Sequence, residues 1–163
     1  MSRALLEFLA SVVPEENIRQ QEPMSEHTTF RVGGPAEVFV TVDDREQLGK
    51  VIRYLNLTGW SHFLLGNGSN LLVGDKGYKG VVIRLGREFE NVKMEGSRLT
   101  CGAAVSLAKA ARTAMENGFS GLEFASGIPG SVGGGVRMNA GAYGGELGNL
   151  VESVLVMAKD GSL

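Results

Sequence analysis

Two glycine-rich segments hold the residue types that could do chemistry in this chain. Residues 65–72 read LGNGSNLL, and residues 121–148 combine many glycines with few charged side chains. Consecutive backbone N–H groups in a glycine-rich turn form a concave nest that binds phosphate oxygens without a charged side chain. In the second segment, Ile128-Pro129-Gly130-Ser131 is typical of a tight turn, because proline presets φ and glycine accepts a positive φ. The two segments together predict one extended ligand that carries phosphate.

Both segments could instead be ordinary surface loops. Surface loops are usually polar and short, however, whereas the second segment is long and apolar. The standard nucleotide motifs do not fit either segment. A dinucleotide fingerprint would need a glycine where Leu71 stands, and the Gly-Lys-Ser/Thr of a Walker loop does not occur in the sequence. A nucleotide ligand would therefore be held by a different fold.

Composition favours small-molecule partners. The 163 residues carry a formal net charge of −2 with both signs interspersed, so the sequence predicts neither a nucleic-acid partner nor a membrane partner. The single cysteine, Cys101, excludes an internal disulfide and is expected to be a small buried residue of a strand rather than a nucleophile. His27 and His62 lack zinc-type spacing, and we expect no metal site.

The elements that position these segments can be predicted from apolar periodicity. Residues 2–13 have helical spacing, and Glu7 interrupts what would otherwise be the apolar core of a secretory signal, so we expect a packing helix and a cytoplasmic protein. In the first half we expect strands at 36–42, 63–65 and 81–83 and a helix at 45–57, which form a small parallel β-α-β unit. In the second half we expect a hairpin of 90–95 with 98–101, a helix at 105–116 and a strand at 151–157.

These elements predict two lobes that meet near Arg87. We expect residues 1–26 to be an N-terminal helix and lead-in, 27–87 the first lobe, and 88–163 a second lobe with a mixed or antiparallel sheet. The strand at 151–157 runs into Asp160-Gly161, a hairpin turn signal, without a returning strand. This pattern predicts a fragment of a longer protein, with an apolar edge prone to self-association, although a natural edge strand is the alternative.

Three motifs in order resemble the flavin-binding part of the UDP-N-acetylenolpyruvoylglucosamine reductase family, also called UDP-N-acetylmuramate dehydrogenases. They are HTTFRVGGPA at 27–36, GNGSNLL at 66–72, and GIPGSVGG at 127–134 followed by MNAGAYG at 138–144. The resemblance implies an α+β, two-lobed FAD-binding domain of the p-cresol methylhydroxylase and vanillyl-alcohol oxidase type. It also implies FAD as cofactor, NADPH as reductant, and a UDP-sugar substrate in peptidoglycan precursor synthesis. The substrate-binding domain and its catalytic residues would lie beyond Leu163.

The same resemblance implies the residues that bind the cofactor. Residues of the first loop match the pyrophosphate loop, those at 127–134 match the segment along the flavin and its phosphates, and those at 139–143 match a loop that approaches the cofactor. The implied residues are Gly66, Asn67, Gly68, Ser69, Asn70, Leu71, Gly127, Ile128, Pro129, Gly130, Ser131, Val132, Gly133, Gly134, Asn139, Gly141, Ala142 and Tyr143.

Ser69 stands where related covalent flavin oxidases carry a linking histidine, so non-covalent FAD is expected. Arg137 could stabilise reduced flavin or be a solvated surface residue, and Arg31 could follow a strand bend. No residue is expected to be catalytic, and the chain alone is expected to bind FAD without turnover. A valine at Gly68 is expected to block the phosphates while leaving much of the fold intact. Two alternatives stay open: a flavin oxidase of the same fold, and a non-catalytic nucleotide-binding or interaction module.

Overall fold

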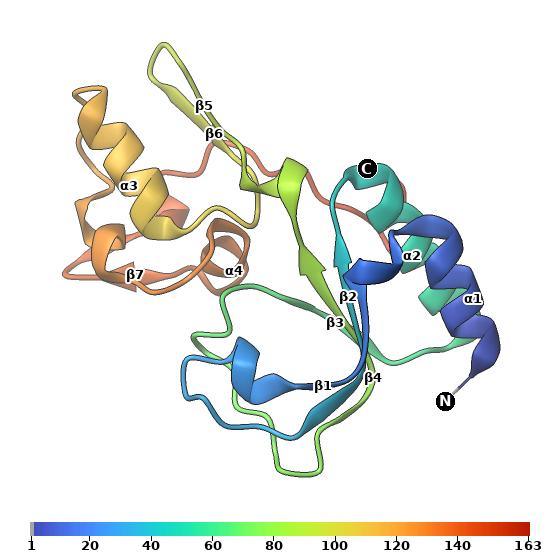
Figure 1. Cartoon of the computed structure of the whole chain (residues 1–163). Coiled ribbons are helices and arrows are strands. Elements are labelled where there is room, and N and C mark those ends of the chain that lie inside the picture. The colour runs from blue at the N-terminus through green and yellow to red at the C-terminus, as the bar shows by residue number, and fades with distance from the viewer. Residues whose placement is uncertain (1) are drawn as a thin grey trace. The chain divides into compact units, whose positions relative to one another are not determined.

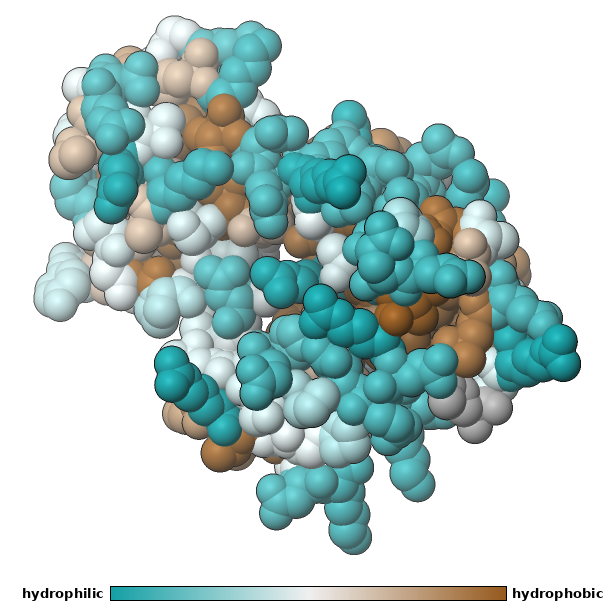
Figure 2. Space-filling view, viewed as in Figure 1, coloured by the Kyte–Doolittle hydropathy of each residue, from teal (hydrophilic) through white to brown (hydrophobic). Residues whose placement is uncertain are grey.

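The computed structural model describes residues 2–163, which form two compact units. The first unit contains the described residues up to Gly86 together with Leu155–Leu163, and the second contains Arg87–Val154. The chain therefore passes from one unit to the other twice. Hydrophilic residues cover most of the face seen in Figure 2, with apolar residues in small separate areas.

The first unit is a four-stranded sheet with two helices (Figure 1). Its strands lie in the order β1-β2-β4-β3, with β1 antiparallel to β2 and the other neighbours parallel. The elements are α1 (Arg3–Val12), β1 (Ile18–Pro23), β2 (Pro35–Val42), α2 (Arg45–Thr58), β3 (His62–Leu65) and β4 (Tyr78–Leu85). The predicted strand-helix-strand unit is present, but β4 lies between its two strands.

The local sequence explains where α2 begins and ends. The Asp44 carboxylate accepts a hydrogen bond from the Gln47 N–H and caps the helix, and Gly59 ends it in the left-handed conformation. The apolar face of α2 includes Val51 and Leu55, both fully buried. Helix α1 packs beside α2, with the Phe8 and Tyr54 rings stacked at a centroid distance of 3.8 Å. Burial of these faces fixes both helices on the unit.

The second unit consists of two helices and two small antiparallel hairpins. Its elements are β5 (Val92–Glu95), β6 (Arg98–Cys101), α3 (Leu107–Glu116), α4 (Val132–Met138), β7 (Gly141–Ala142) and β8 (Gly145–Glu146). The Ser106 hydroxyl caps α3 by accepting from the Lys109 N–H. A small core of Leu107, Ala125 and Leu147 holds α3 and α4 together. The predicted antiparallel pairing in this half of the chain is confirmed.

Three predictions about the ends of the chain are wrong. Residues 2–26 are not a separate lead-in, because β1 pairs with β2 and Leu5 and Leu9 are fully buried in the first unit. Residues 155–163 do not belong with the second lobe. They pack on α2, where Arg53 Nε donates to the Asp160 carbonyl oxygen at 2.7 Å. Residues 151–157 form no strand, because no neighbouring strand pairs with them.

Candidate functional site

The first glycine segment leaves the end of β3 and lies directly against residues 27–29. Gly68 has a φ of +64°, and a Cβ atom added there would be 1.9 Å from the His27 carbonyl oxygen. The Thr29 N–H donates to the Gly68 carbonyl oxygen at 3.1 Å. Only glycine satisfies both the left-handed backbone and the close approach. The structure thus joins the first two of the three motifs into one local site.

A pocket of about 270 Å³ lies beside this contact. Arg84, in β4 next to Leu65 of β3, brings a cationic side chain to it, and no other part of the described chain forms a hydrogen bond or ion pair with its guanidinium. Apart from Leu65, the remaining lining is polar and includes one carboxylate, that of Glu26. The lining residues are Glu26, His27, Thr28, Thr29, Leu65, Gly66, Asn67 and Arg84.

Of the residues that were predicted to bind a cofactor, Gly66 and Asn67 line this pocket. Thr28, Thr29 and Arg84 were not predicted as site residues. The motif at 27–36 had been seen in the sequence, but its contact with the glycine loop joins segments that are distant along the chain. Nothing in the sequence marked Arg84 as a site residue, because an arginine near the end of a strand is common.

The glycine loop has backbone donors that the protein leaves unused. Among residues 2–163, no acceptor receives the N–H groups of Asn67, Gly68 and Ser69. Gly68 is buried. Buried N–H groups in folded proteins nearly always have a partner, because leaving one unpaired costs free energy. These donors fit an anionic ligand such as a pyrophosphate, which is the chemistry that the sequence predicted for this loop.

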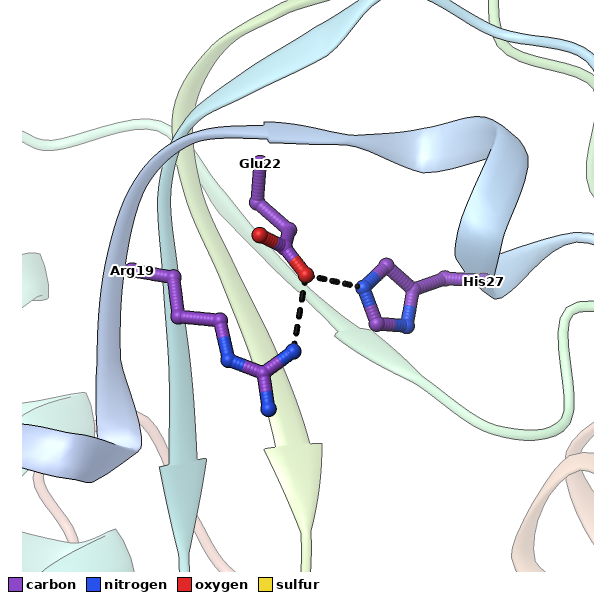
Figure 3. Close-up of polar contacts among 3 residues, drawn as sticks. All are labelled: Arg19, Glu22 and His27. Carbon is purple, nitrogen blue, oxygen red and sulfur yellow. Dashed lines mark hydrogen bonds and ion pairs between the residues drawn. The ribbon is translucent and has the colours of Figure 1, made fainter.

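His27, which lines the pocket, forms a polar cluster with Glu22 and Arg19 (Figure 3). The Glu22 carboxylate accepts hydrogen bonds from Arg19 Nη1 and His27 Nε2, each at 2.8 Å. Partial burial acts to raise the pKa of Glu22, but the hydrogen bonds from His27 and Arg19 and their charges outweigh it, so the pKa lies below its ordinary value of 4.5. The His27 ring also stacks on Phe39, with centroids 4.2 Å apart.

The second glycine segment serves mainly to pack α4 inside its own unit. The N–H groups of Val132 and Gly133 donate to the carbonyl oxygens of Val105 and Ala103 at 2.7 and 2.8 Å. A Cβ atom at Gly133 would lie 2.8 Å from the Cβ of Ala103. The buried Ser131 hydroxyl caps α4 by accepting from the Gly134 N–H. The N–H groups of Val132, Gly133 and Gly134 are therefore engaged within the protein.

Two donors of that segment do remain. Within the described part of the chain, the N–H groups of Gly130 and Ser131 have no acceptor. The adjoining Gly127 backbone is open, since a Cβ atom there would meet nothing within 4 Å. The role of Ile128, Pro129, Val132, Gly133 and Gly134 as cofactor contacts stays a prediction.

The MNAGAYG part of the third motif leads from the end of α4 into the β7–β8 hairpin. Tyr143 and Gly144 both have positive φ, 54° and 85°, and the Tyr143 side chain is fully exposed. The Asn139 side chain is engaged elsewhere, because its Oδ1 atom accepts from the Gly148 N–H at 2.8 Å. The Asn139 side chain thus binds the backbone at Gly148, after the hairpin. The exposed Tyr143 side chain is accessible to a ligand. Contacts of Gly141 and Ala142 with a cofactor stay predictions.

Other chemistry has little support in the structure. Cys101 is half-buried in β6, and burial raises the pKa of its thiol despite the opposing charge of Lys109, which disfavours a nucleophilic thiolate. No group of three or more His, Cys, Asp or Glu residues able to hold a metal ion occurs within residues 2–163. In the same range, no helix is long and apolar enough to cross a membrane.

The α+β units and the glycine-rich loop with unpaired N–H groups are typical of a nucleotide-cofactor-binding domain, and residues 36–163 match the family described as FAD binding domain. The chain belongs to this family, which confirms FAD as the predicted cofactor. It is similar to UDP-N-acetylenolpyruvoylglucosamine reductases. Identity is 49% over 144 residues to the Heliobacterium modesticaldum enzyme, covering 88% of this chain and 46% of that protein. It is 43% over 159 residues to the Clostridium tetani enzyme, covering 98% and 50%.

Solved structures agree with this grouping. The reductase from Thermus caldophilus is 41% identical with a TM-score of 0.68, over 80% of this chain and 46% of that one. p-Cresol methylhydroxylase shares the fold alone, at 15% identity and a TM-score of 0.55, over 85% of this chain and 29% of that one. The predicted fold class is therefore confirmed. The chain spans about half the length of the reductases it matches.

Proposed function

We propose that this chain is the FAD-binding part of a reductase that converts UDP-N-acetylglucosamine enolpyruvate to UDP-N-acetylmuramate in peptidoglycan precursor synthesis. The observation that carries the proposal is the loop at 66–71. The N–H groups of Asn67, Gly68 and Ser69 have no acceptor in the described chain, and Gly66 and Asn67 line a pocket that also holds the unpaired Arg84 guanidinium. The similarity to reductases at 43–49% identity supports the choice of reaction.

In this proposal the protein binds and orients the cofactor. The N–H groups of Asn67, Gly68 and Ser69 donate to the pyrophosphate oxygens, and Arg84 balances their charge. In the second unit, taken by itself, Gly130, Ser131 and Tyr143 stay proposed cofactor-binding residues, as the family resemblance implies. The bound flavin would supply hydride-transfer chemistry, with NADPH as the reductant and the enolpyruvyl double bond as the acceptor.

The proposal also covers what these 163 residues do not do. We assign no catalytic residue among them, and we propose that turnover needs residues in addition to them. The twofold greater length of the similar reductases supports this part of the proposal. Non-covalent attachment of FAD and a cytoplasmic location complete it.

Reconstitution tests the proposal directly. The purified chain is mixed with excess FAD, desalted, and examined by absorption spectroscopy from the near ultraviolet to the visible. We expect the protein fraction to keep flavin absorbance in a ratio of about one FAD per chain. A protein fraction that stays colourless after this treatment, while circular dichroism shows that it is folded, would reject the proposed function.

A further inference from the structure

The Glu22–His27 contact connects the sheet of the first unit to the wall of the loop pocket. Glu22 lies in β1 opposite Ala36 of β2, and His27 ends the short helical turn that follows β1 (Figure 3). The side chains of Glu22 and His27 are only 17% and 8% exposed. Their hydrogen bond therefore forms largely out of water, where its geometry is well defined.

The His27 ring is held on two sides. Its Nε2 atom donates to Glu22, and its face stacks on Phe39, which is buried in the core of the sheet. A ring that is fixed in this way also fixes its own backbone. The His27 carbonyl oxygen is the atom against which Gly68 packs, and two residues later the Thr29 N–H binds the Gly68 carbonyl oxygen. The backbone of residues 27–29 is thus in direct contact with the loop at Gly68.

Stability alone is a weak reason for this cluster. Beside it lie Met24, Ala36 and Phe39, all buried in one apolar core cluster. At such a place, well-packed apolar side chains are often as stabilising as a partly buried ion pair, because desolvation of the charges offsets their attraction. An apolar pair at positions 22 and 27 would lack the directional hydrogen bond that holds the His27 ring.

We propose that Glu22 and His27 are positioning residues that hold the loop at 66–70 in the geometry that binds the FAD pyrophosphate. This inference rests on the proposed function, since it concerns the same pocket. Neither side chain needs to touch the cofactor. Their effect passes through the His27 backbone to Gly68, and from there to the N–H groups of Asn67, Gly68 and Ser69.

Two substitutions at one position separate positioning from simple packing. His27→Phe keeps an aromatic ring that can stack on Phe39 but has no donor for Glu22, whereas His27→Gln keeps a donor and loses the ring. We expect His27→Phe to raise the dissociation constant for FAD at least tenfold and His27→Gln to stay within about threefold of the parent. Glu46→Gln is the control, because it alters an exposed carboxylate that pairs with Lys50.

FAD affinity is measured by titration well below the melting temperature of each variant, and melting temperatures are recorded in parallel. If both His27 variants bind FAD as the parent does, or if His27→Gln binds more weakly than His27→Phe, the inference is overturned. Should His27→Phe fail to fold, Glu22→Leu takes its place against Glu22→Gln, with the larger loss of affinity expected for leucine and equal affinities overturning the inference. A parent chain that binds no FAD would instead overturn the proposed function.

Discussion

The carbonyl oxygen of His27 lies 1.9 Å from where a side chain at Gly68 would begin. Two segments that are distant in the sequence therefore meet backbone to backbone. The contact explains why glycine is needed at position 68, and it differs from the reason that the sequence suggested. From the sequence, Gly68 was expected to leave room for phosphate. In the structure, the space beside Gly68 is taken by the backbone of His27.

Gly68→Val should consequently disturb the loop as well as abolish FAD binding. A branched side chain at a φ of +64° that also collides with the His27 backbone should lower the free energy of unfolding by more than about 2 kcal/mol. Urea unfolding and FAD titration measure the two effects. Gly59→Ala is the control, because Gly59 has a similar φ of +73° with nothing within 4 Å, and it should cost only about 1 kcal/mol and keep FAD affinity. A stable Gly68→Val protein that binds FAD would contradict the assignment.

Arg84→Gln should weaken FAD binding without unfolding the protein. The guanidinium lines the pocket and has no partner in the described chain, so its loss removes charge from the ligand site and breaks no internal contact. We expect a loss of about tenfold in affinity and a weaker dependence of affinity on salt. Lys79→Gln, an exposed residue of the same strand outside the pocket lining, is the matched control. Equal losses of FAD affinity in the two variants would show that Arg84 has no specific role in binding FAD.

The Glu22 cluster should make a contribution to stability that disappears in acid. Because the pKa of Glu22 in the folded protein lies below its ordinary value of 4.5, the charged carboxylate stabilises the fold above that pH, and this contribution is lost as the pH falls below 4.5 through the folded-state pKa. The difference in unfolding free energy between the parent and Glu22→Gln should therefore shrink as the pH falls below 4.5. Urea unfolding at each pH gives this difference in free energy. A difference that grows as the pH falls below 4.5 would contradict the prediction.

Bound FAD should leave the protein on denaturation. Ser69 has no imidazole to form a covalent link to the flavin. Acid precipitation of the reconstituted chain should therefore leave yellow colour in the supernatant and a colourless pellet. Flavin absorbance that stays with the pellet would show a covalent bond and would favour the oxidase alternative.

Much of the fold could be predicted from apolar periodicity. Helix α2 and strands β2 and β4 combine regular apolar spacing with clear ends, such as Asp44 and Gly59 for α2. Strand β1 was not predicted, because its sequence IRQQEP is polar and forms a strand only by pairing with β2. The prediction for residues 151–157 failed in the opposite way. These residues are rich in β-branched side chains, but a high strand propensity does not produce a strand when no neighbouring strand pairs with it.

Only part of the candidate site could be predicted from the sequence. Glycine spacing predicted a phosphate-binding loop at 66–71, and in the structure the N–H groups of Asn67, Gly68 and Ser69 have no acceptor among the described residues. In the segment at 127–134, Gly133 allows α4 to pack on Ala103, and the role of this segment in cofactor binding stays a prediction. Arg84, Thr29 and the Glu22–His27 pair were missed, because their roles depend on contacts between distant segments that carry no local pattern.

The most direct test of the account compares the affinity of this chain for FAD and for riboflavin, which carries the same flavin without phosphate. If the N–H groups of the loop at 66–71 and Arg84 bind the pyrophosphate, FAD should bind at least about a hundredfold more tightly than riboflavin, and Arg84→Gln should reduce that ratio. Calorimetric titration of both ligands into the parent and the variant supplies the numbers. Equal affinities for FAD and riboflavin would contradict the central claim that this loop is a pyrophosphate site.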